Sequence, residues 1–346
     1  MKKTLSILFI LSAVISSCKV YVENERRPVY LQGVSDRFLY LHTGDEVTVT
    51  TASTPEGYPF KWSSRDVNVA TVDQTGKITA TGIGQTDIII ASTYPYQNLS
   101  ETVQVTVFSD DVYTFRSAYL KMIPVKGGTV TIGKEDYPLN PARVVTVGDF
   151  MLAEVEVSRQ LWCAVVKKLV LSDVALCPYV DTYDAWETEF LAALREMTGK
   201  PFRFPTEAEW EYAAKAGENT TYSGGNDLNE LGWHKGSPGV VLNFSYAAHY
   251  INLPMMSYKP NSWGFYDMSG NAAEWVSDII PRIEGNLSIL DPDDLKYQEE
   301  LISQSESHIA KGGSAFSPAS CCTIWSREAY SSNPNTFGPF GLRVAL

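Results

Sequence analysis

The feature that most constrains the fold of this 346-residue chain is a series of short β-branched segments between Leu31 and Phe108. Gly, Pro, Asp and Asn separate these segments, which include VTVTT at 47–51, TDIIIAS at 86–92 and TVQVTV at 102–107. β-Branched side chains suit a pleated, half-buried surface, and the intervening residues favour turns. The sequence therefore predicts an all-β sandwich over residues 31–108.

Motifs within this predicted sandwich resemble those of the bacterial Ig-like group 2 domain. They are FKWSS at 60–64, VATVD at 69–73, GKITA at 76–80 and GQT at 84–86. From the residue types alone, Trp62 should pack between two sheets, and Asp73 to Gly76 should form a hairpin turn. The resemblance implies a spacer or adhesion module. We expect a spacer, because no chemistry-bearing side chains converge in this segment.

The N-terminus has the parts of a signal peptide. Two lysines precede an apolar run over residues 5–15, and two serines and Cys18 follow it. The run is too short to span a bilayer as a permanent helix. The Ile-Ser-Ser-Cys segment resembles a lipoprotein signal peptidase site, and a plain secretory signal with an incidental cysteine is the alternative.

This pattern predicts an exported lipoprotein with a signal peptide over residues 1–17, cut before Cys18 and carrying lipid on the Cys18 thiol. Residues 18–30 are polar without a sustained period, so we expect a tether there. The membrane would then be a partner through the lipid anchor. The expected location is the cell envelope, at the outer membrane, with the folded part exposed on the surface.

Charge and cysteine content exclude some classes of partner and of fold. The net charge of -12 repels polyanions, and no Lys/Arg cluster offers a local exception, so nucleic acid is not an expected partner. Apart from Cys18, the cysteines are Cys163, Cys177, Cys321 and Cys322, too few to hold the fold by bridges. A ring between the adjacent pair would be strained, so any bridge would join Cys163 or Cys177 to a distant partner.

Residues 119–346 follow a short linker at 109–118 and differ in character from the predicted sandwich. Long irregular stretches rich in Gly and Pro alternate with few helical patterns. One helix is predicted from Ser158 to Lys168, with Ser158 as its N-cap, and a second from Tyr183 to Met197.

A third helix is predicted after Pro205, where Thr206 and Glu209 have the spacing of a capping box. Glu207, Glu209 and Glu211 could also be read as paired catalytic acids. We favour a structural role, because the helix dipole stabilises acids in a first turn and the cap already uses Glu209.

Several segments of this C-terminal part occur in a characteristic order. They are GGTVTIG at 127–133, EVS at 156–158, RFPTEAEWEYAA at 203–214, PNSWGFYDMSGNAAEW at 260–275, KGGS at 311–314 and GLRV at 341–344. Together they strongly resemble the formylglycine-generating-enzyme (sulfatase-modifying factor) family. The resemblance implies an α+β fold, a decorated C-type-lectin-like domain over residues 119–346, preceded by the all-β Ig-like sandwich.

The resemblance also bears on activity. The oxygen-dependent enzymes of the family use two cysteines, five positions apart, after the Gly-Gly-Ser turn, to bind copper. On this chain those positions fall on Ser317 and Cys322. Because serine is a poor soft-metal ligand and does no thiol redox chemistry, we expect no enzyme activity. Histidines 42, 234, 249 and 308 lack the paired spacing that the iron oxygenases of this fold need, and kinase and hydrolase motifs are absent.

Calcium is the candidate cofactor, since the resemblance implies that family members can hold it near the turn that contains Asn271 and Glu274. Side-chain and main-chain oxygens in a Gly-rich turn are suitable ligands for this hard cation. The alternative is that Asn271 adopts a left-handed backbone, Glu274 bonds local amides and Trp275 belongs to the core.

Residues 315–337 mix large aromatics with Ser, Asn and Thr and show no amphipathic period. Rigid aromatic anchors among adaptable polar residues are typical of a recognition surface. The candidate ligand-binding residues are Phe316, Ile324, Trp325, Tyr330, Asn333, Asn335 and Phe337. The alternative is that these aromatics form the core of a terminal hairpin, and we expect Arg327 and Arg343 to be structural.

In plan, the chain is similar to the retroelement-diversified variable proteins of this fold, whose ligand surface lies in the last stretch. We therefore predict a non-catalytic cell-surface lipoprotein that binds an extracellular protein or glycan. The alternatives are a structural component of an envelope or motility complex and, against the Ser317 substitution, an oxidase of the formylglycine-generating type.

Overall fold

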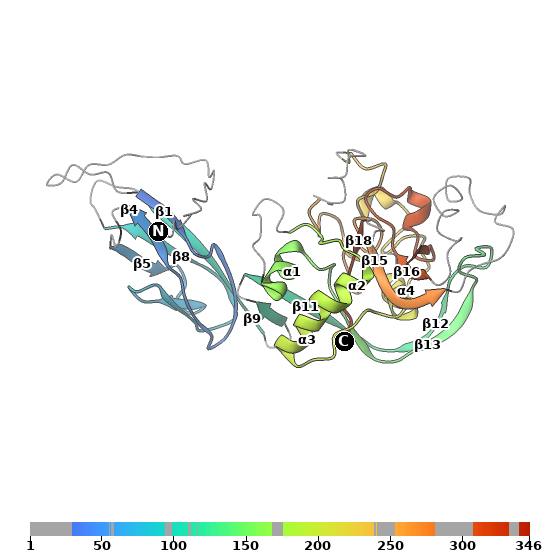
Figure 1. The fold of residues 1–346 in the computed structure, drawn as a ribbon, viewed down its shortest axis with the longest axis horizontal. Helices are drawn as coiled ribbons and strands as arrows, with labels where there is room; N and C mark the ends of the chain where they lie inside the picture. Colours follow the sequence, from blue (N-terminus) through green and yellow to red (C-terminus); the bar gives the residue numbers. More distant parts are fainter. Residues whose placement is uncertain are drawn as a thin grey trace, which may run out of the picture. The chain divides into compact units, whose positions relative to one another are not determined.

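The computed structural model of this chain is divided into two compact units, Met1–Ser109 and Asp110–Leu346 (Figure 1). It describes residues 30–54, 56, 59–93, 99–109, 112–115, 117–167, 176–238, 240, 253–280, 307–331 and 339–346. The predicted signal peptide, Cys18 and nearly all of the tether lie outside the described residues. Within the described ranges, no helix is both long and apolar enough to cross a membrane.

The described part of the N-terminal unit consists of strands, as predicted. One sheet has the order β2 (Phe38–His42), β9 (Ser100–Phe108), β8 (Gly84–Ser92) and β5 (Phe60–Ser64). A second contains β3 (Glu46–Thr48), β7 (Lys77–Ala80) and β6 (Ala70–Val72). A third pairs β1 (Tyr30–Val34) with β4 (Thr51–Thr54).

The core of this unit follows from the alternation along its strands. Ile88 and Ile90 of β8 are fully buried, while their neighbours face outward in part. Trp62 is buried as predicted. The hairpin turn is also confirmed: the Gly76 amide donates to the Asp73 carbonyl at 3.2 Å, and Gly76 has a φ of +84°. A Cβ there would lie 2.3 Å from the Val49 carbonyl oxygen, so the turn requires glycine.

The C-terminal unit combines short sheets with few helices (Figure 1). β10 (Val112–Phe115), β11 (Ala118–Val125) and β14 (Phe150–Ala153) form one sheet, and β12 (Gly128–Ile132) pairs with β13 (Arg143–Val147). The last sheet has the order β17 (Glu328–Ser331), β16 (Ser307–Lys311), β15 (Ala273–Ile280) and β18 (Phe340–Gly341). Helical segments are α1 (Arg159–Val166), α2 (Tyr183–Ala185), the π-helical η2 (Trp186–Leu191), α3 (Ala192–Thr198), α4 (Glu207–Lys215), and the 3-10 turns η3 (Leu228–Glu230) and η4 (Ala319–Cys322).

The helix starts follow the local capping residues. Ser158 caps α1 by accepting from the Leu161 amide at 3.0 Å. The predicted capping box of α4 is present: the Thr206 hydroxyl accepts from the Glu209 amide at 3.2 Å, and the Glu209 carboxylate accepts from the Thr206 amide at 2.7 Å. The predicted second helix differs in its middle, where the π-helical turn places Trp186 in the core.

The last residues of the chain run through the centre of the C-terminal unit. Phe340, Leu342 and Val344 are at most 1% exposed. The backbone of Ala345 bridges to Leu152 and to Arg203, which lie in two separate segments. These final residues therefore join parts of the core that are far apart in the sequence.

Candidate functional site

The segment that follows β16 is folded back on itself by two glycines. Gly312 has a φ of +85° and Gly313 a φ of +66°. A Cβ on Gly313 would lie 2.8 Å from both the Cys321 carbonyl oxygen and the Cys322 sulfur. This close approach brings Ser314 and Ser317 next to the turn that carries the two cysteines.

The two positions that correspond to the family's cysteines are buried side chains with structural partners. The Ser317 hydroxyl donates to a Glu328 carboxylate oxygen at 3.1 Å and accepts from the Ser314 amide at 3.0 Å. The Cys322 sulfur lies 3.5 Å from the Pro318 carbonyl oxygen. Ser317 and Cys322 are both 0% exposed.

This environment suppresses thiol chemistry. Burial raises the pKa of the Cys322 thiol well above its ordinary value, and the negative charge of Glu328 raises it further. The reactive and metal-binding form of cysteine is the thiolate. Near neutral pH, Cys322 is therefore a protonated, enclosed thiol beside a hydroxyl.

Trp325 lies in a stretch whose neighbours are fixed by polar contacts. The Trp325 carbonyl accepts from the Asn140 side-chain amide at 3.0 Å, and the Ser326 hydroxyl donates to the Ser320 carbonyl at 2.9 Å. Next along the chain, Arg327 forms a 2.5 Å ion pair with Glu207. The Trp325 side chain itself is only half-buried. It is therefore held in place with part of the indole exposed.

The other predicted ligand residues differ from one another in how far their side chains are exposed or described. Ile324 is wrong as a ligand residue, because its side chain is 0% exposed and packs in the core cluster around Trp210. Phe316 is half-buried, like Trp325. Tyr330 lies on β17 opposite His308, and its side chain is not among those described. Asn333, Asn335 and Phe337 lie outside the described residues.

A buried ionic network lies behind Trp325. Lys311 is 0% exposed, and its ammonium lies 2.9 Å from Glu211 and 3.5 Å from Glu207. Glu207 also pairs with Arg143 at 2.8 Å and with Arg327. Burial alone would raise the pKa of Glu207, but the Arg327 hydrogen bond and the surrounding cations lower it to about 2. A carboxylate held ionised in this way is a structural partner and a poor proton carrier, as its position in the helix suggested.

Glu274 is also occupied by a structural partner. The Arg343 guanidinium contacts its carboxylate at 2.7 Å, and the Trp210 indole N–H donates to it at 2.6 Å. Asn271 adopts a left-handed backbone with a φ of +61°, and its amide donates to Glu156 at 3.1 Å. The left-handed Asn271 and the buried Trp275 match the structural alternative for the turn. The Glu274 carboxylate differs from it, because its partners are the sequence-distant Arg343 and Trp210 side chains in place of the local amides expected. The ion pair with Glu274 also supports the structural role expected of Arg343, which is fully buried.

Calcium binding at this turn stays a prediction. Asn271 Oδ1, Asp267 Oδ1 and Glu156 Oε2 are buried without a hydrogen-bond partner, and oxygens of this kind suit a hard cation. Burial raises the pKa of Asp267 to about 6 and that of Glu156 well above its ordinary value. However, no group of three or more His, Cys, Asp or Glu side chains in the described residues is arranged to hold a metal ion.

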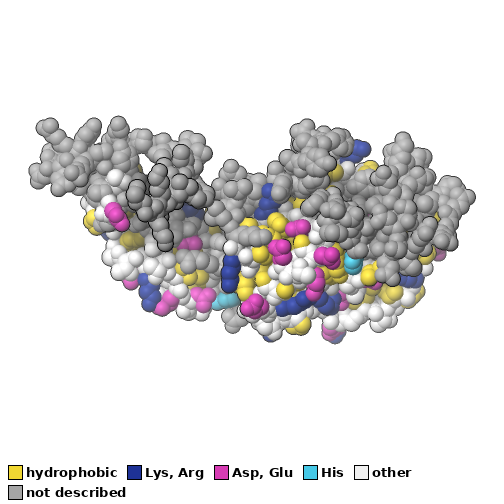
Figure 2. All heavy atoms as spheres, in the orientation of Figure 1, with side chains coloured by type: hydrophobic (Ala, Val, Ile, Leu, Met, Phe, Trp, Pro, Cys, Tyr) yellow, Lys and Arg dark blue, Asp and Glu magenta, His cyan; other side chains and the backbone are white. Residues whose placement is uncertain are grey.

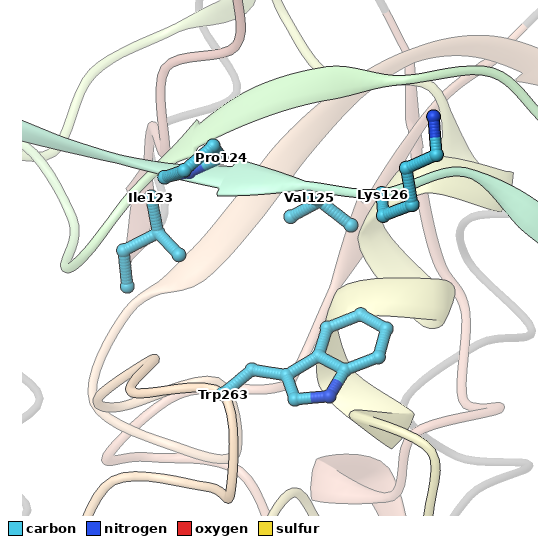
Figure 3. Close-up of a pocket in the computed structure, with 5 residues that line it drawn as sticks. All are labelled: Ile123, Pro124, Val125, Lys126 and Trp263. Atoms are coloured by element: carbon cyan, nitrogen blue, oxygen red, sulfur yellow. The ribbon is translucent and has the colours of Figure 1, made fainter.

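A groove of about 360 Å³ lies between β11 and Trp263 (Figure 3). Ile123 and Val125 point toward the indole, whereas the Lys126 ammonium points away from it (Figure 3). That ammonium pairs with Asp149 at 2.6 Å. The groove thus offers apolar contact without a facing acid, base or nucleophile. On the face shown in Figure 2, acidic and basic side chains are interspersed over the described surface.

Comparison with known families agrees with this architecture. Residues 178–346 match the sulfatase-modifying factor enzyme 1-like domain, and residues 34–105 match the bacterial Ig-like domain (group 2). The C-terminal unit contains a sulfatase-modifying-factor-like domain. The resemblance seen in the sequence motifs is therefore confirmed, as is the order of the two domains.

Relatives of the sulfatase-modifying-factor-like domain differ in what their names describe. The formylglycine-generating enzyme of Streptomyces coelicolor is 32% identical over 153 residues, which cover 41% of this chain and 46% of that protein. The chaperone protein LppX of Paenibacillus barcinonensis is 40% identical over 84 residues, covering 21% and 30%. The chain thus spans less than half the length of either of these curated relatives.

Among solved structures, Treponema denticola variable protein 1 is similar with a TM-score of 0.53 and 22% identity. The match covers 68% of this chain and 97% of that one. At this identity the likeness concerns the fold alone. It confirms the mixed α+β, C-type-lectin-like class predicted for the C-terminal unit.

The residues that sequence reasoning missed are those that meet Trp325 from elsewhere. Asn140 is separated from Trp325 by 185 positions, and Lys134 lies over the indole ring with its ammonium 4.2 Å from the centroid. Both residues belong to the loop between β12 and β13, whose composition gave no indication of this contact.

Proposed function

We propose that this chain is a non-catalytic cell-surface lipoprotein whose C-terminal unit binds a protein or glycan ligand through residues 315–337. The observation that carries the proposal is the state of the former catalytic positions. Ser317 stands at the first cysteine position of the resemblance and is hydrogen-bonded to Glu328. Cys322 is fully enclosed, and burial raises the pKa of its thiol.

Ligand binding is supported by the way in which Trp325 is held. Partners that are fixed before binding lose little conformational entropy on association, and tryptophan is enriched at the energetic centres of interfaces. The Ile324 amide bonds the Thr221 carbonyl before Trp325, and the Asn140 contact and the Arg327–Glu207 pair hold the chain at and after Trp325, while the indole stays half-buried. Trp325 is the described residue that we expect to contribute most to binding.

The test compares ligand capture with folding. A glycan array and a panel of purified extracellular proteins are probed with the full chain, and positive ligands are then measured against a Trp325→Ala, Tyr330→Ala double variant. We expect capture to be lost while thermal melting changes little. Trp263→Ala, a half-buried tryptophan at the separate groove, is the matched control and should still bind. A fall in melting temperature of many degrees for the double variant would assign these side chains to the core instead.

Anchoring at the envelope is a separate part of the proposal. Cys18→Ser should prevent incorporation of labelled fatty acid and release the chain from the membrane fraction. Digestion of intact cells with protease should remove the C-terminal unit if it faces outward. Incorporation of label into Cys18→Ser would contradict the lipoprotein assignment.

The variable-protein interpretation extends the proposal to residues 315–337. The similar Treponema denticola structure carries that name. A near-copy of its coding region beside a reverse transcriptase gene would support diversification. A structural role in an envelope complex would instead predict binding spread over many surfaces of the unit and insensitive to Trp325.

The oxidase alternative has its own test. Copper binding followed by thiol-dependent oxygen uptake would support the oxidase alternative. We expect neither, because the Ser317 hydroxyl is a poor ligand for a soft metal such as copper. A signal that disappears in Cys322→Ser would overturn the non-catalytic assignment.

A further inference from the structure

A lysine from another segment lies over the Trp325 ring. Lys134 follows Gly133 at the end of β12, and its ammonium lies 4.2 Å from the centroid of the Trp325 ring. Among the described residues, Lys134 has no carboxylate within ion-pair distance. An ammonium held against an indole face is attracted by the ring quadrupole and remains available to an anion. The two side chains therefore form one composite feature of the surface.

The buried ionic network near this pair combines three cations with two acids. Lys311, Arg143 and Arg327 share two buried carboxylates, Glu207 and Glu211. Glu211 also accepts from the Gly133 amide at 2.8 Å, next to Lys134. The acids behind Trp325 are thus already matched by other cations.

Two acids, Glu135 and Asp136, follow Lys134 on the same exposed turn. Among the described residues, neither acid forms an ion pair or contacts the indole. At an exposed site, solvent and salt screen their effect on an anion bound at the ammonium. They also provide a built-in control for the charge argument.

We propose that Lys134 and Trp325 form an anion-selecting subsite of the recognition surface, and that its ligand is an acidic glycan. This inference rests on the proposed ligand-binding function and deepens it by naming the ligand class. A carboxylate or sulfate of the glycan pairs with the Lys134 ammonium. The apolar face of the same sugar ring packs against the part of the Trp325 indole that stays exposed beside the lysine.

A glycan suits this subsite better than a folded protein partner does. One ammonium and one half-exposed indole form a small contact, which is weak when used once. A polymer that repeats the same acidic sugar gains from multivalent attachment of several lipoprotein copies on one surface. A rigid sugar ring also presents its charge and its apolar face at a fixed spacing, whereas an acidic peptide must order several bonds to do so.

The experiment uses an array that pairs uronic-acid and sulfated glycans with their neutral parents, together with poly-glutamate peptides. The full chain should bind acidic glycans, should ignore the neutral parents, and should bind less at high salt. Lys134→Gln should weaken binding by about fivefold to tenfold. Lys200→Gln, an exposed lysine on another turn, should leave binding unchanged, and Asp136→Asn should strengthen it slightly.

The possible outcomes distinguish failure of the anion subsite from failure of the proposed ligand-binding function. If neutral and acidic glycans bind alike, or if Lys134→Gln binds as the unmodified chain does, the anion subsite is overturned while Trp325→Ala still tests the recognition surface. Binding of poly-glutamate in place of glycans, dependent on Lys134, would overturn the choice of a glycan. No binding to any glycan or peptide would also overturn it. Carboxylated and sulfated probes in the same array distinguish the two sources of the anion, and melting curves confirm that each variant is folded.

Discussion

Replacing Glu207 by Gln should destabilise the C-terminal unit in a way that depends on pH. The side chain is 1% exposed, and its carboxylate forms ion pairs with Arg143, Arg327 and Lys311. Its pKa of about 2 compares with 4.5 when unperturbed. Because each pKa unit corresponds to about 1.4 kcal/mol, ionised Glu207 contributes about 3 kcal/mol at pH 7. Loss of one partner of a buried charge network has a cost of about 3 to 5 kcal/mol, which agrees in size.

The sign of the pH dependence follows from the lowered pKa. The contribution of Glu207 is complete above the unfolded value near 4.5 and is lost as the pH falls through the folded value of about 2. The difference in unfolding free energy between the original chain and Glu207→Gln should therefore be largest above about pH 5. It should shrink steadily toward pH 2.

Urea denaturation followed by tryptophan fluorescence measures this difference, because every tryptophan except Trp62 lies in the C-terminal unit. The matched control is Glu218→Gln, an exposed glutamate beyond the end of α4, which should change stability very little. A loss below about 1 kcal/mol at pH 7, or a loss that stays constant down to pH 3, would refute the assignment of Glu207 as the ionised centre of the network.

Three further predictions concern the turn and the buried groups around it. Cys322 should resist thiol reagents in the folded chain at pH 8 and react after denaturation, which a mass-spectrometric labelling series would detect; rapid labelling of the native protein would contradict its burial. Gly313→Ala should lower the free energy of unfolding by about 1 to 3 kcal/mol, because the added Cβ would lie 2.8 Å from a backbone oxygen. Gly148→Ala is the control, since nothing lies near the position of its Cβ. Equal effects of the two substitutions would argue against the turn geometry. Calcium, expected from Asn271 and Glu274, should raise the melting temperature, and Asn271→Ala should remove that rise; an unchanged melting curve at millimolar calcium would eliminate the cation.

The parts of the structure that the sequence predicts are those determined by near neighbours. Ser158 and the Thr206–Glu209 pair determine helix starts within one turn, and the Asp73–Gly76 turn needs only the backbone freedom of its glycine. The strand alternation of the N-terminal unit is equally local, because successive side chains point to opposite faces.

The composite surface at Trp325 could not be predicted in this way. Its contacts with Lys134 and Asn140 join segments nearly two hundred residues apart, and neither partner stands in a recognisable motif. Ile324 was assigned to the ligand surface because residues 315–337 lack a period that separates inward from outward positions. The Ile324 amide donates to the Thr221 carbonyl at 3.1 Å, and this distant contact helps turn its side chain into the core.

The π-helical turn of η2 illustrates a third kind of difference. Spacing alone predicted a regular helix through Trp186 and Phe190. A wider turn changes which residues share a face, and here Trp186, Phe190 and Leu191 are all buried together. The choice between the two helix types depends on the shape of the surrounding core, which composition does not reveal.

The position of Phe340, Leu342 and Val344 in the core has a consequence for synthesis of the chain. Until these residues are synthesised, β15 lacks its parallel neighbour and Glu274 lacks Arg343. The C-terminal unit therefore cannot complete its fold before these residues emerge, and a product shortened before Phe340 should be digested rapidly by protease while the N-terminal unit survives. Resistance of such a product would disprove this. Termination before Phe340 should therefore yield chains whose C-terminal unit is unfolded, and not a folded unit that lacks only its last strand.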